Sequence, residues 1–250
     1  MRFIKPGQAL ELIKKAKNGA PGLFGRKPEL LFRDDNIFSD PGYAKKLFKE
    51  MAPLGIKWSA NSSIDIAFDD QALAKASGCR ELFIGFETIY PEKLQKTSAG
   101  NMHSTDGYIK AIRKVKSYGI KVIGAFILGF DYYTHKDYFR LIYFLARARL
   151  YLISLTILTP FPGSALYEQL LKENRITSFD WRKYDSLQHV VFKPKHMPAW
   201  ALQAWFVVIR SITLLLSPLY IELVIKSLAL LFFSYYVMFY LSGLLIRLFF

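Results

Sequence analysis

The chain has 250 residues, of which 52% are hydrophobic and 22% are charged. This composition is too apolar for a disordered protein, and it suffices for one large domain or two small ones with a substantial core. The single cysteine excludes an internal disulfide framework, a four-cysteine zinc site and an iron–sulfur cluster held by this chain alone.

The formal net charge of +14 indicates affinity for anions, such as phosphates, acidic lipid headgroups or nucleic acid. The Lys and Arg residues rarely cluster beyond pairs and form no stripe interleaved with aromatic residues, so the sequence predicts no nucleic-acid partner. Residues 1–17 carry charges throughout and lack the apolar core of a signal peptide. Together with the lone cysteine, this predicts a cytoplasmic protein.

Short apolar runs alternate with amphipathic segments after an N-terminal linker and helix in residues 1–28. The runs predict strands at 30–32, 56–62, 82–86, 120–130 and 152–158. The intervening segments predict helices at 41–51, 69–78, 104–118, 134–149 and 162–173. This alternation is typical of an α/β fold with a parallel sheet. Five strands are too few for a closed eight-stranded barrel, which leaves an open doubly wound sheet or a partial barrel.

The predicted strands all end in polar or glycine-rich residues, and both folds bind ligands beyond the carboxyl ends of their strands. Asp34 and Asp35 either hydrogen-bond a ligand's hydroxyl or ammonium groups or form a turn or helix cap. Glu87 points either to a barrel mouth or into solvent. Gly124 and Gly129 mark a bulge or a close approach of ligand to backbone, or else tight packing of helix on sheet.

Other polar and reactive residues predict no further chemistry. The histidines have no metal-ligand spacing, so no metal site is predicted, and no phosphate-binding or dinucleotide-binding glycine motif is present. Cys79 is interpreted as a small buried hydrophobe rather than an activated thiolate.

Five segments between residues 29 and 197 resemble a known family. They read LLFRDDNIFSDPGYAKKLFKEMAPLGIKWSANSSI, GCRELFIGFET, GIKVIGAFILGFD, LTPFPGSALYEQLLKENRI and WRKYDSLQHVVFKPKHM. In this order they resemble the radical S-adenosylmethionine (SAM) superfamily, and within it the group that often carries an N-terminal cobalamin-binding domain. The resemblance implies a partial, TIM-like β/α barrel over residues 29–174 that lacks its first strand. An accessory region, 175–200, and hydrophobic helices, 201–250, would follow.

The resemblance also implies which residues contact SAM, namely side chains at the strand ends and a glycine-bearing strand. These residues are Asp34, Asp35, Asn36, Asn61, Ser63, Glu87, Gly124, Phe126, Gly129, Thr159 and Phe161. It implies no particular catalytic residue. In the family, a four-iron four-sulfur cluster at the barrel mouth binds SAM, and its reductive cleavage yields a deoxyadenosyl radical.

The family's C-x-x-x-C-x-x-C loop, which holds the cluster, is missing from this sequence. We therefore expect a fragment, or a chain that works with a separately encoded N-terminal half, rather than a self-sufficient enzyme. The third explanation for the missing loop is that the chain is a decayed relative of these enzymes. The predicted function is the SAM-binding portion of a radical enzyme that methylates or otherwise modifies an apolar or lipid-like substrate. The alternative is a non-catalytic, membrane-associated barrel remnant that binds a ligand or partner.

The last fifty residues contain only four charges, at Arg210, Glu222, Lys226 and Arg247. Residues 227–246 form 20 uncharged residues, enough for a helix of about 30 Å, the thickness of a bilayer core. The stretch 201–221 is also apolar and is compatible with an interfacial helix. The sequence thus predicts attachment to membrane lipid, against the alternative that two helices close the open side of the barrel.

Overall fold

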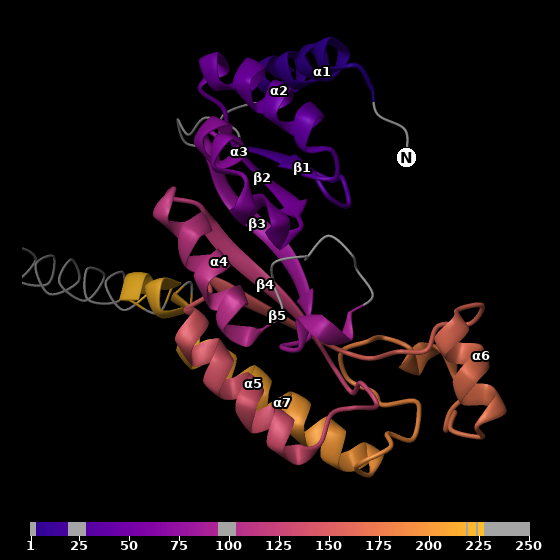
Figure 1. The fold of residues 1–250 in the computed structure, drawn as a ribbon. Coiled ribbons are helices and arrows are strands. Elements are labelled where there is room, and N and C mark those ends of the chain that lie inside the picture. Colours follow the sequence, from indigo (N-terminus) through magenta and orange to yellow (C-terminus); the bar gives the residue numbers. More distant parts are fainter. Residues whose placement is uncertain (1–3, 20–28, 95–103, 219, 224, 228–250) are drawn as a thin grey trace, which may run out of the picture.

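A computed structural model of the chain describes residues 4–19, 29–94, 104–218, 220–223 and 225–227. Its centre is a parallel sheet of five strands in the order β1-β2-β3-β4-β5 (Figure 1). The strands are β1 (Glu29–Phe32), β2 (Lys57–Ser62), β3 (Cys79–Glu87), β4 (Lys121–Leu128) and β5 (Leu152–Ile157). All five predicted strands are therefore present, with β3 longer than predicted.

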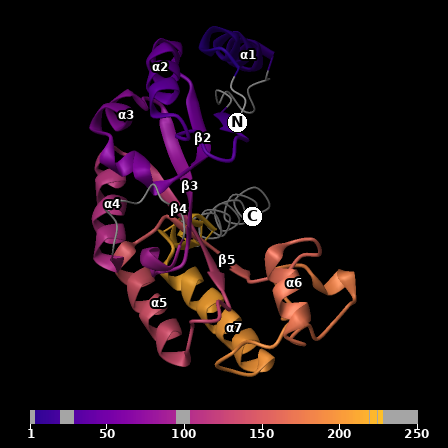
Figure 2. The ribbon, with the colours of Figure 1, turned by 45° about the vertical axis from the view of Figure 1, so that its right-hand side comes forward.

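Helices connect the strands and cover one face of the sheet. They are α2 (Pro41–Met51), α3 (Asp70–Lys75), α4 (Thr105–Ser117) and α5 (His135–Ala148). Each crossover leads to the next strand in space, and right-handed crossovers of this kind place every helix on the same side. Figure 2 shows these helices along one side of the curved sheet. A doubly wound sheet would have a shuffled strand order and helices on both faces, so the arrangement matches a partial barrel, which the described residues do not close.

The remaining helices flank this unit. They are α1 (Pro6–Gly19), α6 (Ala165–Lys172), α7 (Ala199–Leu216) and the short 3-10 helices η1 (Ala52–Leu54), η2 (Ile64–Phe68), η3 (Pro91–Lys93) and η4 (Trp181–Lys183). Helix α7 packs on α5 and β5. By length and composition, α7 is the one helix among the described residues that could cross a membrane. Apart from Ser227, the predicted membrane segment 227–246 lies outside the described residues.

Local sequence determines where the helices begin and end. Asp40 accepts a hydrogen bond from the Tyr43 N–H at 2.9 Å and so caps α2. Thr134 and Asp137 form a capping box at the start of α5, in which the Asp137 carboxylate accepts from the Thr134 N–H at 2.8 Å. Helix α4 ends before Gly119, whose φ of 78° is in the left-handed region that glycine tolerates.

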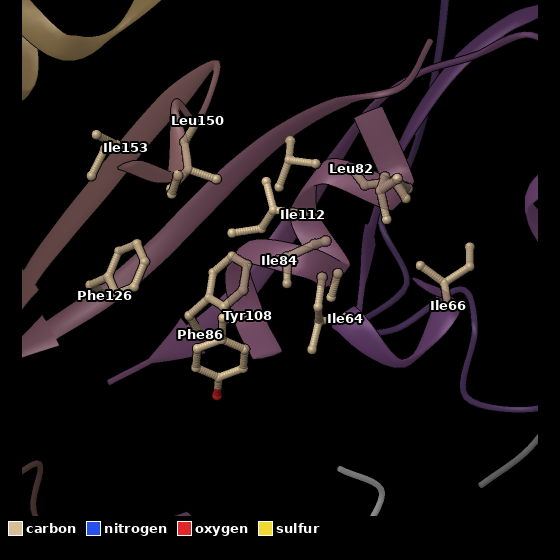
Figure 3. Close-up of a cluster of buried hydrophobic side chains, with 14 of the residues drawn as sticks. Ile64, Ile66, Leu82, Ile84, Phe86, Tyr108, Ile112, Phe126, Leu150 and Ile153 are labelled. Atoms are coloured by element: carbon tan, nitrogen blue, oxygen red, sulfur yellow. The ribbon is translucent and has the colours of Figure 1, made fainter. Parts of the chain in front are cut away.

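The core lies between the sheet and the covering helices. Along β3, Leu82, Ile84 and Phe86 are buried, whereas Phe83 between them is exposed, as strand alternation requires. The rings of Phe86 and Phe126 stack at 5.4 Å between centroids. Figure 3 shows this cluster together with residues of η2 and α4. The face of the sheet that none of the described strand-connecting helices covers, called the open face below, carries the alternate residues of each strand.

Candidate functional site

A cleft of about 430 Å³ opens at the carboxyl ends of β1, β2 and β3. Among the residues predicted to contact SAM, its lining includes Asp35, Asn36, Asn61, Ser63 and Glu87. The other lining residues are Ser62, Ile64, Asp65, Phe83, Gly85, Pro91, Leu94 and Tyr108. The structure therefore brings together polar strand ends that lie up to 52 residues apart in the sequence, from Asp35 to Glu87.

Two asparagines join the ends of β1 and β2. The Asn36 Oδ1 accepts hydrogen bonds from the backbone N–H groups of Phe38 and Ser63, both at 3.0 Å. The Asn61 Nδ2 donates to the Asp34 carbonyl at 3.0 Å. Part of the hydrogen-bonding capacity of each amide is therefore used to fix the loop. This bracing holds Asp35 and Ser63 at the rim of the cleft.

Glu87 is positioned by an irregularity at the end of β3. The register between β3 and β4 shifts between Gly85 and Glu87, which places one extra residue in β3. Glu87 has a φ of 62°, a conformation that costs a non-glycine residue free energy. The Glu87 Oε1 lies 2.5 Å from the point that a Cβ at position 85 would occupy. The carboxylate thus folds over the open face of Gly85, and a side chain at position 85 would displace it.

The described lining of the cleft is acidic, although the chain as a whole is strongly basic. Asp35, Asp65 and Glu87 contribute carboxylates, and this lining contains no Lys, Arg or His. Such a site favours ligands with cationic groups or with hydroxyl groups that can donate to carboxylates.

Tyr108 adds a hydroxyl group from α4. Burial raises the pKa of Tyr108, and the carboxylates of Glu92, Asp65 and Glu87 raise it further. The phenol is therefore protonated at neutral pH and can donate a hydrogen bond. Figure 3 shows the Tyr108 ring within the buried cluster and its oxygen directed out of it.

Two predicted contact residues, Gly124 and Phe126, lie on the face that the helices cover. A Cβ at Gly124 would meet Leu150 Cδ1 at 2.6 Å and Phe86 Cδ2 at 3.3 Å. Phe126 is fully buried and contacts the ring of Phe144 at 5.8 Å. This environment corresponds to the alternative of close packing between helix and sheet, so neither residue belongs to the cleft.

The other predicted residues lie outside the described lining of this cleft. Gly129 has a φ of 106°, and a Cβ there would lie 2.8 Å from Leu202 of α7. Thr159 donates its hydroxyl to the Ile157 carbonyl at 3.0 Å, and Phe161 is exposed beyond β5. Asp34 lines a second cleft, of about 570 Å³, between α1 and the end of β1, which shares Asp35 and Asn36 with the first.

The structure adds lining residues that the sequence interpretation missed. Phe83 and Gly85 alternate with the buried residues of β3 and so reach the open face; strand alternation was the available signal. Asp65 lies two residues after the predicted Ser63, in η2. Tyr108 comes from a distant helix, and no local pattern marks it.

The described residues do not fit an iron–sulfur cluster. Cys79 lies at the beginning of β3, at the opposite end of the strand from the cleft. Burial raises the pKa of its thiol to about 12, so the thiolate that a metal requires is disfavoured. No group of three or more His, Cys, Asp or Glu side chains in the described part of the chain is arranged to hold a metal ion.

Comparison with known proteins finds relatives over about two thirds of the chain. Bacteriochlorophyllide d C-12(1)-methyltransferase from Chlorobaculum tepidum is 33% identical over 174 residues, which are 69% of this chain and 37% of that protein. Hopanoid C-2 methylase from Rhodopseudomonas palustris is 24% identical over 197 residues, covering 65% and 36% of the two chains. No protein-family model matches the chain.

A solved structure shares the fold. The radical SAM methyltransferase TsrM from Kitasatospora setae, with cobalamin and a [4Fe-4S] cluster bound, has a TM-score of 0.53 at 16% identity, covering 65% of this chain and 32% of that one. The fold is therefore similar to that of a radical SAM methyltransferase, in agreement with the predicted resemblance. In sequence, the chain is a homologue of methyltransferases, and it spans about a third of the length of the curated relatives it matches.

Proposed function

We propose that the cleft at the ends of β1, β2 and β3 binds SAM, and that the chain forms the SAM- and substrate-facing portion of a radical SAM methyltransferase. The observation that carries this proposal is the acidic cleft on a chain homologous to such enzymes. SAM has a sulfonium and an ammonium group, both cationic, and a ribose with two hydroxyl groups. Each of these groups is complementary to carboxylates.

The chain's own residues would hold and orient SAM. Glu87, kept over Gly85 by the β3 irregularity, is placed to accept hydrogen bonds from ribose hydroxyls or from the ammonium group. Asp35 and Asp65 add negative charge at the rim, and the Tyr108 hydroxyl can donate to an acceptor. Phe83 supplies an apolar surface at the floor of the cleft. When bound, SAM would supply the methyl group.

The cluster requires cysteines that these 250 residues do not contain, because Cys79 is the only one. Any cluster would therefore be held by another stretch of polypeptide, whether in the same protein or in a separately encoded N-terminal half. No step involving the cluster or cobalamin follows from the described residues.

The composition of the open face favours an apolar substrate. Besides Phe83 in the cleft, this face carries Leu31, Ile123, Ala125 and Ile127, all at least partly accessible. The relatives named above act on bacteriochlorophyllide d and on a hopanoid. We propose a lipid-like substrate and, from the apolar C-terminal sequence, a cytoplasmic protein attached to membrane lipid.

The test is SAM binding by the full chain, measured by isothermal titration calorimetry at millimolar SAM, for the wild type, Glu87→Gln and Glu81→Gln. Glu81 is a matched control because it belongs to the same strand, about 20 Å towards its amino end. We expect weak binding by the wild type, with a dissociation constant above micromolar because no cluster is present. Glu87→Gln should weaken it about tenfold or more, since a hydrogen bond to a charged group contributes about 1.5 to 3 kcal/mol.

Equal affinity of Glu87→Gln and Glu81→Gln for SAM would refute the assignment of the cleft as the SAM site. No binding by the wild type at millimolar SAM would instead favour the alternative of a non-catalytic remnant.

A further inference from the structure

Helix α7 is apolar on both sides. Its buried side has Leu202, Phe206, Ile209 and Thr213, spaced three or four residues apart. Its opposite side exposes further large apolar residues, namely Trp200, Val207, Val208, Leu214 and Leu215. A surface helix of a soluble domain is normally polar on this side. The exposed side of α7 therefore indicates a contact with an apolar environment.

Helix α5 extends this apolar surface with aromatic and basic residues. Phe139 and Tyr143 are 63% and 65% exposed. Trp205 of α7 joins the two helices: its ring lies 4.9 Å from that of Phe139, and its Nε1 donates to His135 Nδ1 at 2.8 Å. Beside it is an apolar depression of about 250 Å³ between Trp200 and Trp205. We call the surface made by Phe139, Tyr143, Trp200, Trp205 and Val208 the α5–α7 face.

The charges that α5 and α7 present around the α5–α7 face are mainly positive. Lys136, Arg140 and Arg147 are interleaved with its aromatic residues along α5 and are exposed. Arg140 pairs with Asp137, the one acidic residue of α5, whose side chain is only 9% exposed, and Arg147 pairs with Asp106 of α4 at 2.9 Å. Helix α7 has no acidic residue. Tryptophan and tyrosine are enriched at membrane–water interfaces, and Lys and Arg contact anionic headgroups there.

The adjoining sequence also indicates that the α5–α7 face contacts a membrane. Residues 227–246, which follow α7 closely, have the length and composition of a membrane segment. From these observations we infer that the α5–α7 face lies in the headgroup region of an anionic membrane. Trp200 and Trp205 reach the level of the acyl-chain boundary, and the α5 cations contact lipid phosphates.

This contact would place the membrane next to the strand ends. Helix α7 begins at the carboxyl edge of the sheet, because Leu202 in its first turn packs against Gly129, directly after β4. A lipid-like substrate would then reach the open face from the bilayer without crossing water. The membrane contact itself does not depend on SAM binding.

The experiment is tryptophan quenching by acyl-brominated lipids, with the full chain in vesicles of phosphatidylcholine and phosphatidylglycerol. The wild type, Trp200→Phe and Trp181→Phe are compared. Trp200 and Trp181 are 73% and 56% exposed, so neither replacement disturbs the core, and Trp181 lies in η4, away from the α5–α7 face. We expect Trp200→Phe to lose roughly half of the quenching, because Trp205 remains at the interface, and Trp181→Phe to lose none.

Equal quenching of the wild type and Trp200→Phe would overturn the inference, even if residues 227–246 insert into the bilayer. Shielding of Trp200 from aqueous iodide in the absence of vesicles would also overturn it, because a second copy or another part of the chain would then cover the α5–α7 face. A gain of at least severalfold in vesicle binding with phosphatidylglycerol, abolished by Lys136→Glu with Arg140→Glu, would support it. Failure here would leave the SAM-binding result of Glu87→Gln unaffected.

Discussion

Gly85 and Gly124 are neighbours on adjacent strands, but they face opposite sides of the sheet. In the register of β3 and β4, Gly85 pairs with Ala125 and Gly124 pairs with Ile84. The same substitution to alanine should therefore have different effects at the two positions. In Gly85→Ala the new Cβ would meet the Glu87 carboxylate, whereas in Gly124→Ala it would meet buried Leu150 and Phe126 side chains.

The magnitudes follow from these contacts. Overpacking a core costs about 1 to 3 kcal/mol, and alanine regains about 0.5 to 1 kcal/mol over glycine in a strand. The two ranges combine to a net cost of about 0 to 2.5 kcal/mol. Because the new Cβ would lie only 2.6 Å from Leu150 Cδ1, we expect the upper part of this range, a loss of about 1 to 2.5 kcal/mol in the free energy of unfolding, with SAM affinity nearly unchanged. Gly85→Ala should leave the free energy of unfolding unchanged or slightly higher. It should weaken SAM binding about tenfold to a hundredfold, because the Glu87 carboxylate is displaced.

The assays are urea unfolding followed by circular dichroism, and SAM titration by calorimetry, on both variants. The reasoning is refuted if Gly124→Ala weakens SAM binding more than Gly85→Ala does. It is also refuted if Gly124→Ala unfolds at the same urea concentration as the wild type.

Three further predictions concern other parts of the chain. Anaerobic reconstitution should yield no iron–sulfur cluster, because Cys79 is the single cysteine and its pKa is raised to about 12; stoichiometric iron and sulfide with absorbance near about 400 nm would contradict this. Arg175→Gln should destabilise the fold by about 1.5 to 3 kcal/mol at pH 7, since the Arg175 guanidinium donates to the Asp131 carboxylate. Burial opposes ionisation of Asp131, but the hydrogen bond from Arg175 prevails and lowers its pKa. The wild type's advantage in free energy of unfolding should therefore be full above about pH 4 and shrink as the pH falls below it; an advantage that stays constant as the pH falls below about 4 would contradict this. The full chain should remain in a carbonate-washed membrane pellet, and Val237→Arg, near the middle of residues 227–246, should reduce its recovery by opposing insertion at a cost of about 2.5 to 3.5 kcal/mol; equal recovery of both would argue against a membrane segment.

Four of the strands could be predicted from sequence because each is a short apolar run, whereas β2 is marked by alternation, with Trp58 and Ala60 buried between polar residues. Their order could not, since a doubly wound sheet and a partial barrel contain the same alternation of strand and helix. The deciding observation is spatial: β1 to β5 are neighbours in sequence order, with their helices on one side. Only the assembled sheet shows that the described strand-connecting helices leave one face open.

The direction of each side chain explains where the predicted site was incomplete. In β4 every residue from Val122 to Leu128 is apolar or glycine, so no polar alternation indicates which residues face the helices. Gly124 and Phe126 could not be assigned to a face for this reason. In β3, alternation with the buried Ile84 and Phe86 places Glu87 on the open face, and this could be predicted; the register shift after Gly85 and the positive φ of Glu87 could not, because they depend on pairing with β4.

The measurement that tests the central claim most directly is the set of intermolecular nuclear Overhauser effects between SAM and the aromatic rings of the full chain. Phe83→Leu, Tyr108→Phe and Phe126→Leu would assign the ring signals. The proposed cleft predicts contacts from SAM protons to the rings of Phe83 and Tyr108, and none to Phe126, which is buried on the helix-covered face. Contacts to Phe126 without contacts to Phe83 or Tyr108 would contradict the location of the SAM site.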